Sequence, residues 1–398
     1  MGEPRSSLIS SPLRIASSAC LSSHGDELRS NLDPVSRVET RGGDLSGLFN
    51  GLKFLPFRES DHAIRVSRRA DRKTMRDQFL YGCSAAADAL TKARLDNLAD
   101  TGLSVASRMG ERDEHVDDDL FFQAGAESGA KKAPELNLLL SKSLKPTLFL
   151  SQIPNLLAAN ISITMGVTGP SRTFVGEELA GINAVLDSAL SIDAGECSSA
   201  LTGGVLNADR DNVLRSVYAR GYGLETEFGN VWERNRKGTC LGSAAAFLVL
   251  ESPRRCNSGG RRPAAMLSEI WLHRPGTGTG TDMRADLIGA ALNGPRSACI
   301  VTNYTGPRSG FECLEFWEEL GCRVPVYSTA GVIGSCLEAD FHSGVHFGVR
   351  LINGMGWAWP AGAMRTEHVL DSAFSRVIVI CMDSTGSEAM AILDAPDE

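Results

Sequence analysis

The sequence predicts an α/β fold in which helices pack on mixed or parallel sheets, in two halves. Segments with strand-like and helix-like patterns alternate along most of the chain, which is typical of layered α/β proteins. A polar stretch rich in glycine, residues 254–263, separates two such series. The 398 residues are 42% hydrophobic and 22% charged, values that allow a large buried core.

The first half is expected to span residues 12–253, after a disordered tail of residues 1–11. Its helices are predicted where apolar residues recur at helical spacing, and its strands where short apolar runs occur. In chain order we expect a helix over 74–95, a strand over 103–106, a helix turn at 155–159, a strand over 172–176, a buried helix over 178–190, and strands over 198–206 and within 237–255.

The second half is expected to span residues 264–398, after the junction at 254–263. It repeats the alternation of strands and helices that marks the first half. In chain order we expect a strand over 265–272, a helix over 283–292, a strand over 298–303, a helix over 309–320, a strand over 323–328, a helix over 335–353 and a strand over 376–382.

Charge and cysteine usage exclude several classes of protein. The net charge of −8 argues against a nucleic-acid partner, and no run of about 18 apolar residues predicts a membrane span. The ten cysteines are scattered without a CxxC pair, which predicts buried thiols in a reducing, cytoplasmic compartment. No cofactor or metal is predicted. Glu338, His342 and His346 have a spacing that can bind metal on a helix, but structural histidines are the favoured interpretation.

The stretch "FVGEELAG" forms a predicted corner between a strand and a buried helix. Many enzymes place a nucleophile at such a corner, because the helix dipole and free backbone N–H groups stabilise negative charge there. This chain has two acids, Glu177 and Glu178, at that point.

Five segments, in order along the chain, resemble the condensing enzymes of fatty acid and polyketide synthesis, the β-ketoacyl-acyl-carrier-protein synthases. They are "SRRADRKTMRDQFLYGCSAAADAL", "IPNLLAANISITMGVTGPSRT", "ALTGGV", "RKGTCLGSAAAFLVLE" and "VICMDSTGSEAMAIL". The resemblance implies a thiolase-like five-layer αβαβα fold of two similar halves, usually dimeric. It also implies a catalytic cysteine at a helix N-terminus and two histidines that stabilise the enolate formed as a malonyl carrier loses CO₂.

The resemblance places other residues at those three positions. Counting from Gly169-Pro170 puts Glu178 at the cysteine position, and the first histidine position falls on Tyr304, give or take one residue. The second falls on Ser328 or Thr329. A carboxylate is a poor acyl carrier, because a mixed anhydride hydrolyses readily, and the loss of the imidazoles removes the enolate stabilisers.

The sequence therefore favours a non-catalytic member of this family, similar to the chain-length-factor subunits that pair with an active ketosynthase. The alternatives are a malonyl-carrier decarboxylase and an active 3-oxoacyl-carrier synthase, an acyltransferase. A ketosynthase subunit in a heterodimer, or a second copy in a homodimer, is the expected partner, together with an acyl carrier protein.

A basic segment provides a second candidate site. Six cations lie within twelve residues of an acidic protein: Arg65, Arg68, Arg69, Arg72, Lys73 and Arg76. They form either a solvated surface or an electrostatic dock for an acidic acyl carrier protein or partner subunit.

Overall fold

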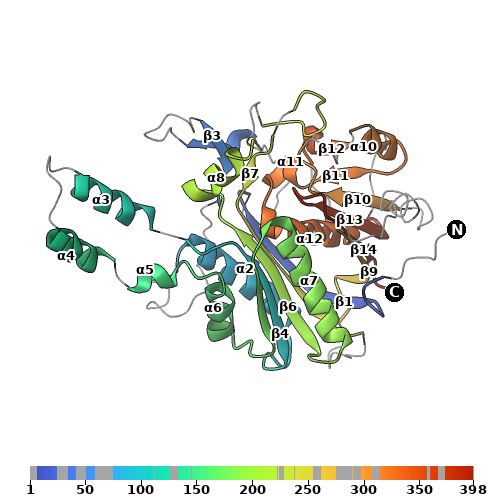
Figure 1. The fold of residues 1–398 in the computed structure, drawn as a ribbon. Coiled ribbons are helices and arrows are strands. Elements are labelled where there is room, and N and C mark those ends of the chain that lie inside the picture. Colours follow the sequence, from blue (N-terminus) through green and yellow to red (C-terminus); the bar gives the residue numbers. More distant parts are fainter. Residues whose placement is uncertain are drawn as a thin grey trace.

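The computed structural model describes residues 7–24, 35–41, 51–58, 75–111, 113–125, 133–144, 146–221, 223, 228–236, 238–253, 261–274, 289, 297–306, 314–355, 359–365 and 373–397. Its main feature is an 11-stranded sheet made of two blocks (Figure 1). The first block contains β1 (Leu13–Ser22), β4 (Thr101–Ser107), β5 (Ser171–Phe174), β6 (Ser199–Leu206) and β8 (Ala244–Glu251). The second contains β9 (Ala265–His273), β10 (Ala298–Thr302), β11 (Val326–Ser328), β13 (Arg376–Met382) and β14 (Glu388–Asp394), with the short β12 (Met364–Arg365) at its edge.

The two blocks have the same topology. From the centre outward, the first block runs β1-β8-β6-β4-β5 and the second runs β9-β14-β13-β10-β11. If the five strands of each block are numbered along the chain, without the short β12, both blocks have the spatial order first, fifth, fourth, second, third. The first two pairings are antiparallel and the last two are parallel in both blocks. The predicted arrangement of two similar halves is confirmed.

Helices form three layers around the two blocks. α2 (Asp77–Ala93) and α6 (Leu156–Met165) cover the outer face of the first block, and α10 (Leu314–Gly321) covers the outer face of the second. Between the blocks lie α7 (Glu177–Asp193) and α12 (Asp340–Ile352), whose buried side chains share one core with both sheets. This is the thiolase-like five-layer arrangement, which confirms the predicted fold class.

Small residues allow the middle layer to pack tightly. A Cβ atom at Gly344 of α12 would lie 2.8 Å from Val379 of β13, and one at Gly348 would lie 2.7 Å from Leu393 of β14. Glycine costs helix stability in isolation, so this helix depends on its packing between the sheets.

The remaining elements lie outside these layers. A three-stranded sheet contains β2 (Glu39–Arg41), β3 (Leu52–Leu55) and β7 (Leu241–Gly242), with α8 (Asp211–Tyr218) beside it. α3 (Glu114–Gly125), α4 (Ala133–Ser143) and α5 (Pro146–Leu150) form an arm that projects away from the sheets (Figure 1). Short helical turns are η1 (Val35–Arg37), α11 (Ala330–Ile333), η2 (Leu337–Ala339) and η3 (Ala361–Ala363).

The ends of the predicted halves need one correction. Residues 7–11, which were expected to belong to a disordered tail, contact the core. The Leu8 amide donates to the Ile270 carbonyl at 2.9 Å, and the Ile9 side chain is buried in the middle layer. β8 ends at Glu251 and β9 begins at Ala265, and residues 254–260 between them lie outside the described residues, so the junction at 254–263 stays a prediction.

Candidate functional site

The corner between β5 and α7 has the geometry that the sequence predicted. Gly176 has a φ of +133°, a conformation that residues with a Cβ rarely adopt, so a glycine is needed where the chain turns into the helix. The helix begins at Glu177, and Glu178 follows in the first turn. Both carboxylates therefore lie at the positive end of the helix dipole.

Glu177 is held by side chains from three other segments. Arg220, just beyond α8, binds both of its oxygens, with one N–H···O distance of 3.0 Å. Arg108, which directly follows β4, lies 3.8 Å from Oε1. Ser384, in the turn after β13, donates to Oε2 at 3.2 Å. The start of α7 is thereby tied to the second half of the molecule.

The environment of Glu177 favours its charged form. Burial by itself raises the pKa of this carboxyl, but the hydrogen bond and charge of Arg220, with Arg108 and Ser384, outweigh it and leave the pKa lowered. Glu177 is therefore ionised at neutral pH and stabilises the N-terminus of α7.

Glu178 points into the protein, where only 1% of it is exposed. Gly181 lies one turn further along α7, on the same face of the helix as Glu178, so the atoms close to Gly181 show which segment packs against this face. A Cβ atom at Gly181 would lie 2.5 Å from the backbone oxygen of Glu338 and 3.6 Å from His342 Nδ1. The segment from η2 into α12 therefore packs against the side of α7 that carries Glu178.

Glu338 is the acid near the start of α7 whose pKa is raised furthest. It is 1% exposed, and neither of its carboxylate oxygens has a hydrogen-bond partner among the described residues. Burial raises its pKa to about 8, and the charge of Arg108 opposes this shift. Its neighbour His342 donates to or accepts from Thr202 Oγ1 at 3.0 Å, and burial lowers the pKa of this histidine to about 3. Both side chains are therefore neutral at pH 7.

These shifts predict how stability depends on pH. Between pH 4.5 and about 8, Glu338 is ionised in the unfolded chain but stays protonated in the folded protein. Raising the pH in this range therefore favours the unfolded chain, and the free energy of unfolding falls. Above pH 8 both states are ionised, and the free energy of unfolding levels off. His342 and His346, with pKa values lowered to about 3, act in the opposite direction below pH 6.5. The effect of Glu338 should therefore be visible between pH 6.5 and 8, at up to about 1.4 kcal/mol per pH unit.

Urea unfolding across this interval measures the slope. Glu338→Gln cannot ionise and should flatten it, whereas Glu318→Gln, an exchange at a partly exposed ion pair on α10, serves as control and should not. Equal slopes in the native protein and Glu338→Gln would contradict the assignment.

The structure places Tyr304 and Ser328 next to each other. Ser328 Oγ donates to the Tyr304 carbonyl at 2.6 Å, and both residues are fully buried. Ser328 ends β11, and Tyr304 follows the adjacent parallel strand β10. The Tyr304 ring stacks on Trp232, with ring centroids 5.0 Å apart, in the core beneath α10. Thr329, the alternative to Ser328, is also buried and donates to the Thr302 carbonyl. These contacts give both side chains structural partners.

The histidines considered for metal binding have hydrogen-bond partners instead. His346 Nδ1 lies 2.9 Å from Ser18 Oγ, and Glu338 belongs to η2, outside the helix that carries both histidines. Within the described ranges, no cluster of three or more His, Cys, Asp or Glu side chains has the geometry for a metal ion. Both histidines therefore have polar partners inside the protein, and their structural role stays a prediction.

Only one cation of the basic segment can be placed. Arg76, at the start of α2, forms an ion pair with Asp113. Arg65, Arg68, Arg69, Arg72 and Lys73 lie outside the described residues, so the docking assignment stays a prediction.

The sequence did not identify the side chains that surround the start of α7. Arg108 and Ser384 each follow a buried strand. Polar residues that directly follow predicted strands could therefore have been named as candidates for this site. Glu338 was considered only as a metal ligand. Its burial depends on the packing of η2 against α7, which no pattern in the sequence revealed.

Comparison with known proteins adds independent findings. Residues 50–255 match the family described as Beta-ketoacyl synthase, N-terminal domain. The chain is 25% identical over 213 residues to a 3-oxoacyl-[acyl-carrier-protein] synthase 2 of Vibrio harveyi, covering 51% of this chain and 47% of that one. It is 24% identical over 208 residues to the enzyme of the same name from Vibrio cholerae, covering 50% and 46%. The alignments thus span about half the length of these curated relatives.

Solved structures share the fold over nearly the whole chain. A β-ketoacyl synthase from Burkholderia phymatum matches with a TM-score of 0.71 and 14% identity, covering 97% of this chain and 99% of that one. A type II polyketide ketosynthase, solved with its acyl carrier protein and a bound hexaketide, matches with a TM-score of 0.68, 14% identity and the same coverage. At these identities the likeness concerns the fold. Among the described residues, no helix is long and apolar enough to cross a membrane.

Proposed function

The chain belongs to the β-ketoacyl synthase family, and from this premise we propose that it is a non-catalytic subunit for fatty acid or polyketide synthesis that pairs with an active ketosynthase. This role resembles that of a chain-length factor. In such a pair the inactive chain completes the dimer and shapes the space for the growing acyl group. The proposal includes the cytoplasm as its location and the two similar halves as its domains, with residues 7–11 part of the folded protein.

The observation that carries the proposal is the carboxylate at the start of α7. Glu178 lies in the first turn of α7 and is 1% exposed. The resemblance assigns the family's nucleophile to this residue, and the proposal rests on that assignment. A carboxylate cannot hold an acyl group stably in water.

The cysteines support the same conclusion. Burial raises the pKa values of Cys20, Cys83 and Cys240 to about 12, and it also raises those of Cys299 and Cys336. Thiols in such surroundings stay protonated, whereas an acyl-carrying cysteine needs an activated thiolate. None of these five thiols can therefore take over the role of an acyl-carrying cysteine.

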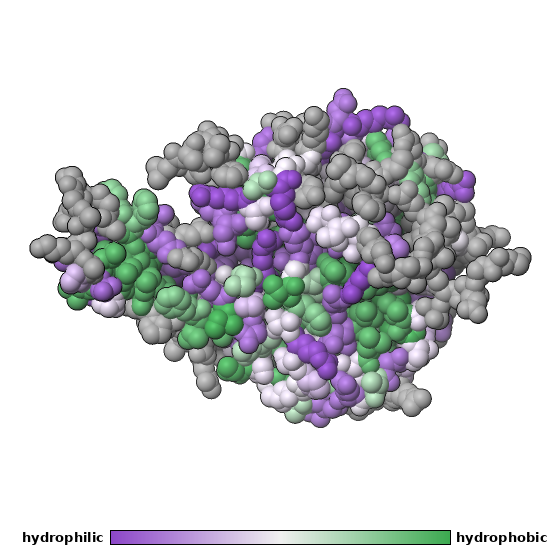
Figure 2. All heavy atoms as spheres, viewed as in Figure 1, coloured by the Kyte–Doolittle hydropathy of each residue, from purple (hydrophilic) through white to green (hydrophobic). Residues whose placement is uncertain are grey.

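Two features favour pairing with another subunit. β5 is the outer strand of the first block, and Ser171 and Arg172 on it are exposed, which leaves an edge that can pair. The arm carries large exposed apolar side chains, including Phe121 at 79% and Phe122 at 75% exposure. Figure 2 shows apolar residues gathered along this arm. Such surfaces mark protein interfaces.

Co-expression with a ketosynthase that has the cysteine and both histidines tests the proposal. We expect the two chains to co-purify as a heterodimer, and elongation only when both are present. The acyl carrier protein is the expected substrate carrier. Robust elongation by a pure homodimer of this chain would overturn the proposal.

The arm provides a specific prediction for the pairing. Phe121→Glu together with Phe122→Glu should weaken the dimer at least thirtyfold, because each buried aromatic at an interface contributes about 2 kcal/mol. Sedimentation velocity over a concentration series measures this change. Met355→Glu, at a 54% exposed site after α12, is the control and should leave the dimer intact. Unchanged association in the double variant would exclude the arm from the interface.

A further inference from the structure

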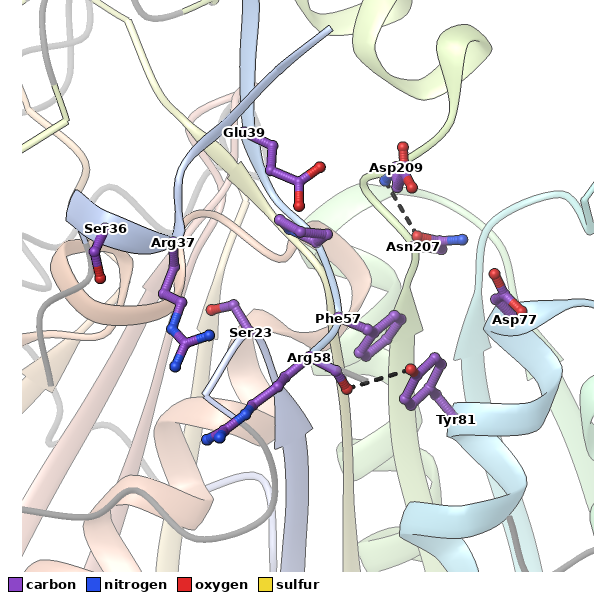
Figure 3. A pocket seen from close by; sticks show the side chains of 11 residues that line it. Ser23, Ser36, Arg37, Glu39, Phe57, Arg58, Asp77, Tyr81, Asn207 and Asp209 are labelled. Carbon is purple, nitrogen blue, oxygen red and sulfur yellow. Dashed lines mark hydrogen bonds between the residues drawn. The ribbon is translucent and has the colours of Figure 1, made fainter. Parts of the chain in front are cut away.

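A polar cavity of about 630 Å³ lies between the small sheet and the start of α2, away from the corner at Glu178. Figure 3 shows its lining. One wall comes from the turn after β1, from η1 and from the end of the β3 segment, and contains Ser23, Arg37 and Arg58. The first half of the chain supplies every side chain in this lining.

Ser23 has an unused hydroxyl in this wall. The residue is 2% exposed, and its Oγ has no hydrogen-bond partner among the described residues. Its position is fixed, because the next residue, His24, donates its amide to Ser22 Oγ and places its ring 3.0 Å from the Val332 carbonyl. A buried hydroxyl without a partner costs free energy unless a ligand or solvent satisfies it.

Two arginines face the same space. Neither Arg37 nor Arg58 takes part in an ion pair with any described residue. The backbone of Arg58 is held on both sides, by donation of its amide to Ser22 O and by acceptance from Tyr81 Oη at 3.3 Å. In Figure 3 both guanidinium groups lie on the side of the cavity where Ser23 lies. Guanidinium pairs bind phosphate and carboxylate groups through charge-assisted hydrogen bonds.

The rest of the lining has the opposite character. Glu39, Asp77 and Asp209 line the remaining walls (Figure 3). The stacked rings of Phe57 and Tyr81 have centroids 3.9 Å apart, and in Figure 3 they lie between the Arg58 side of the cavity and Asp77. A simple anion would meet repulsion from three carboxylates. A ligand with an anionic group at one end and hydrogen-bond donors or an ammonium group at the other would satisfy both walls.

We propose that this cavity binds a small phosphate ester, with its phosphate on Arg37, Arg58 and Ser23 and a donor-bearing or cationic organic part against Asp209 and its acidic neighbours. The site is separate from the corner at Glu178, and its existence does not depend on whether the chain catalyses condensation.

Calorimetric titration of the full chain with a matched pair of probes tests the site. Phosphoethanolamine carries both a phosphate and an ammonium group, whereas ethyl phosphate carries only the phosphate. We expect saturable binding of both, with phosphoethanolamine binding more tightly. Arg37→Gln and Arg58→Gln should each weaken both probes about tenfold. Ser23→Ala should weaken both probes less, and Asp209→Asn should remove the preference for phosphoethanolamine.

Arg323→Gln, at an exposed position beyond α10, is the matched control and should bind both probes like the native protein. The arginine variants replace exposed side chains and are expected to fold, which circular dichroism would check. Absence of saturable binding in the native protein, or equal binding by native protein and the Arg37→Gln/Arg58→Gln double variant, would overturn the proposal. Binding without any preference between the probes would exclude the role of the acidic wall.

Discussion

Purified alone, the chain should not elongate an acyl group with a malonyl carrier, and Glu178→Cys should not restore elongation. The substitution returns a thiol to the start of α7, but it returns neither imidazole. Tyr304 and Ser328 have structural partners in the core, and each missing stabilising donor costs about 10²–10³ in rate. The Glu178→Cys variant should therefore stay about 10⁴-fold or more below an active ketosynthase assayed beside it.

The same assay separates this result from the decarboxylase alternative. Release of labelled CO₂ from a malonyl carrier is measured for the native chain, Glu178→Gln and Glu178→Cys, with the active ketosynthase as positive control. We expect background rates for all three. Decarboxylation by the native chain that Glu178→Gln abolishes would assign a catalytic role to Glu178, and elongation by Glu178→Cys would show that the imidazole positions were misassigned.

Gly204→Ala should destabilise the protein by about 3 kcal/mol or more. Gly204 lies in β6, where a Cβ atom would be 2.1 Å from the backbone oxygen of Glu338 and 2.9 Å from Ala339 Cα. Both contacts involve backbone, so relief requires η2 to move away from the sheet and from α7. Overpacking in a rigid core costs 1–3 kcal/mol, and contacts this short lie at the upper end.

Gly229→Ala is the matched control, because a Cβ atom there would meet nothing within 4 Å. This variant should change the free energy of unfolding by less than about 0.5 kcal/mol. Urea unfolding of the native protein and both variants measures the difference. Equal stability of the two alanine variants would show that η2 is not fixed against β6. It would also contradict the burial assigned to Glu338.

Much of the fold follows from local patterns. The helix expected over 178–190 is α7, and the strands expected over 298–303 and 376–382 are β10 and β13. These segments have a clear period and are buried by neighbours with equally clear patterns, so local and tertiary preferences agree. The arm of α3 to α5 was not predicted as helices, and its large apolar side chains are exposed in the structure rather than packed on the core.

The candidate site was predicted less completely. Glu177 and Glu178 were identified because they lie at a strand-to-helix corner, which is a local feature. Arg108, Arg220 and Ser384 come from three distant segments, and only folding brings them to Glu177. The cavity near Ser23 was not predicted, because Arg37 and Arg58 lie on separate segments of irregular sequence.

The sequence by itself determined the layered α/β class, the two halves and the carboxylate at the start of the central helix. These depend on periodicity and on the order of short segments, which are properties of the chain. Tertiary structure alone decided the pKa shifts of the site: Arg220 lowers the pKa of Glu177 against the effect of burial, and burial of η2 beside α7 raises the pKa of Glu338 to about 8, so that this acid is protonated at pH 7. A pKa depends on the distance to other charges and to water, and only the packed molecule fixes those distances.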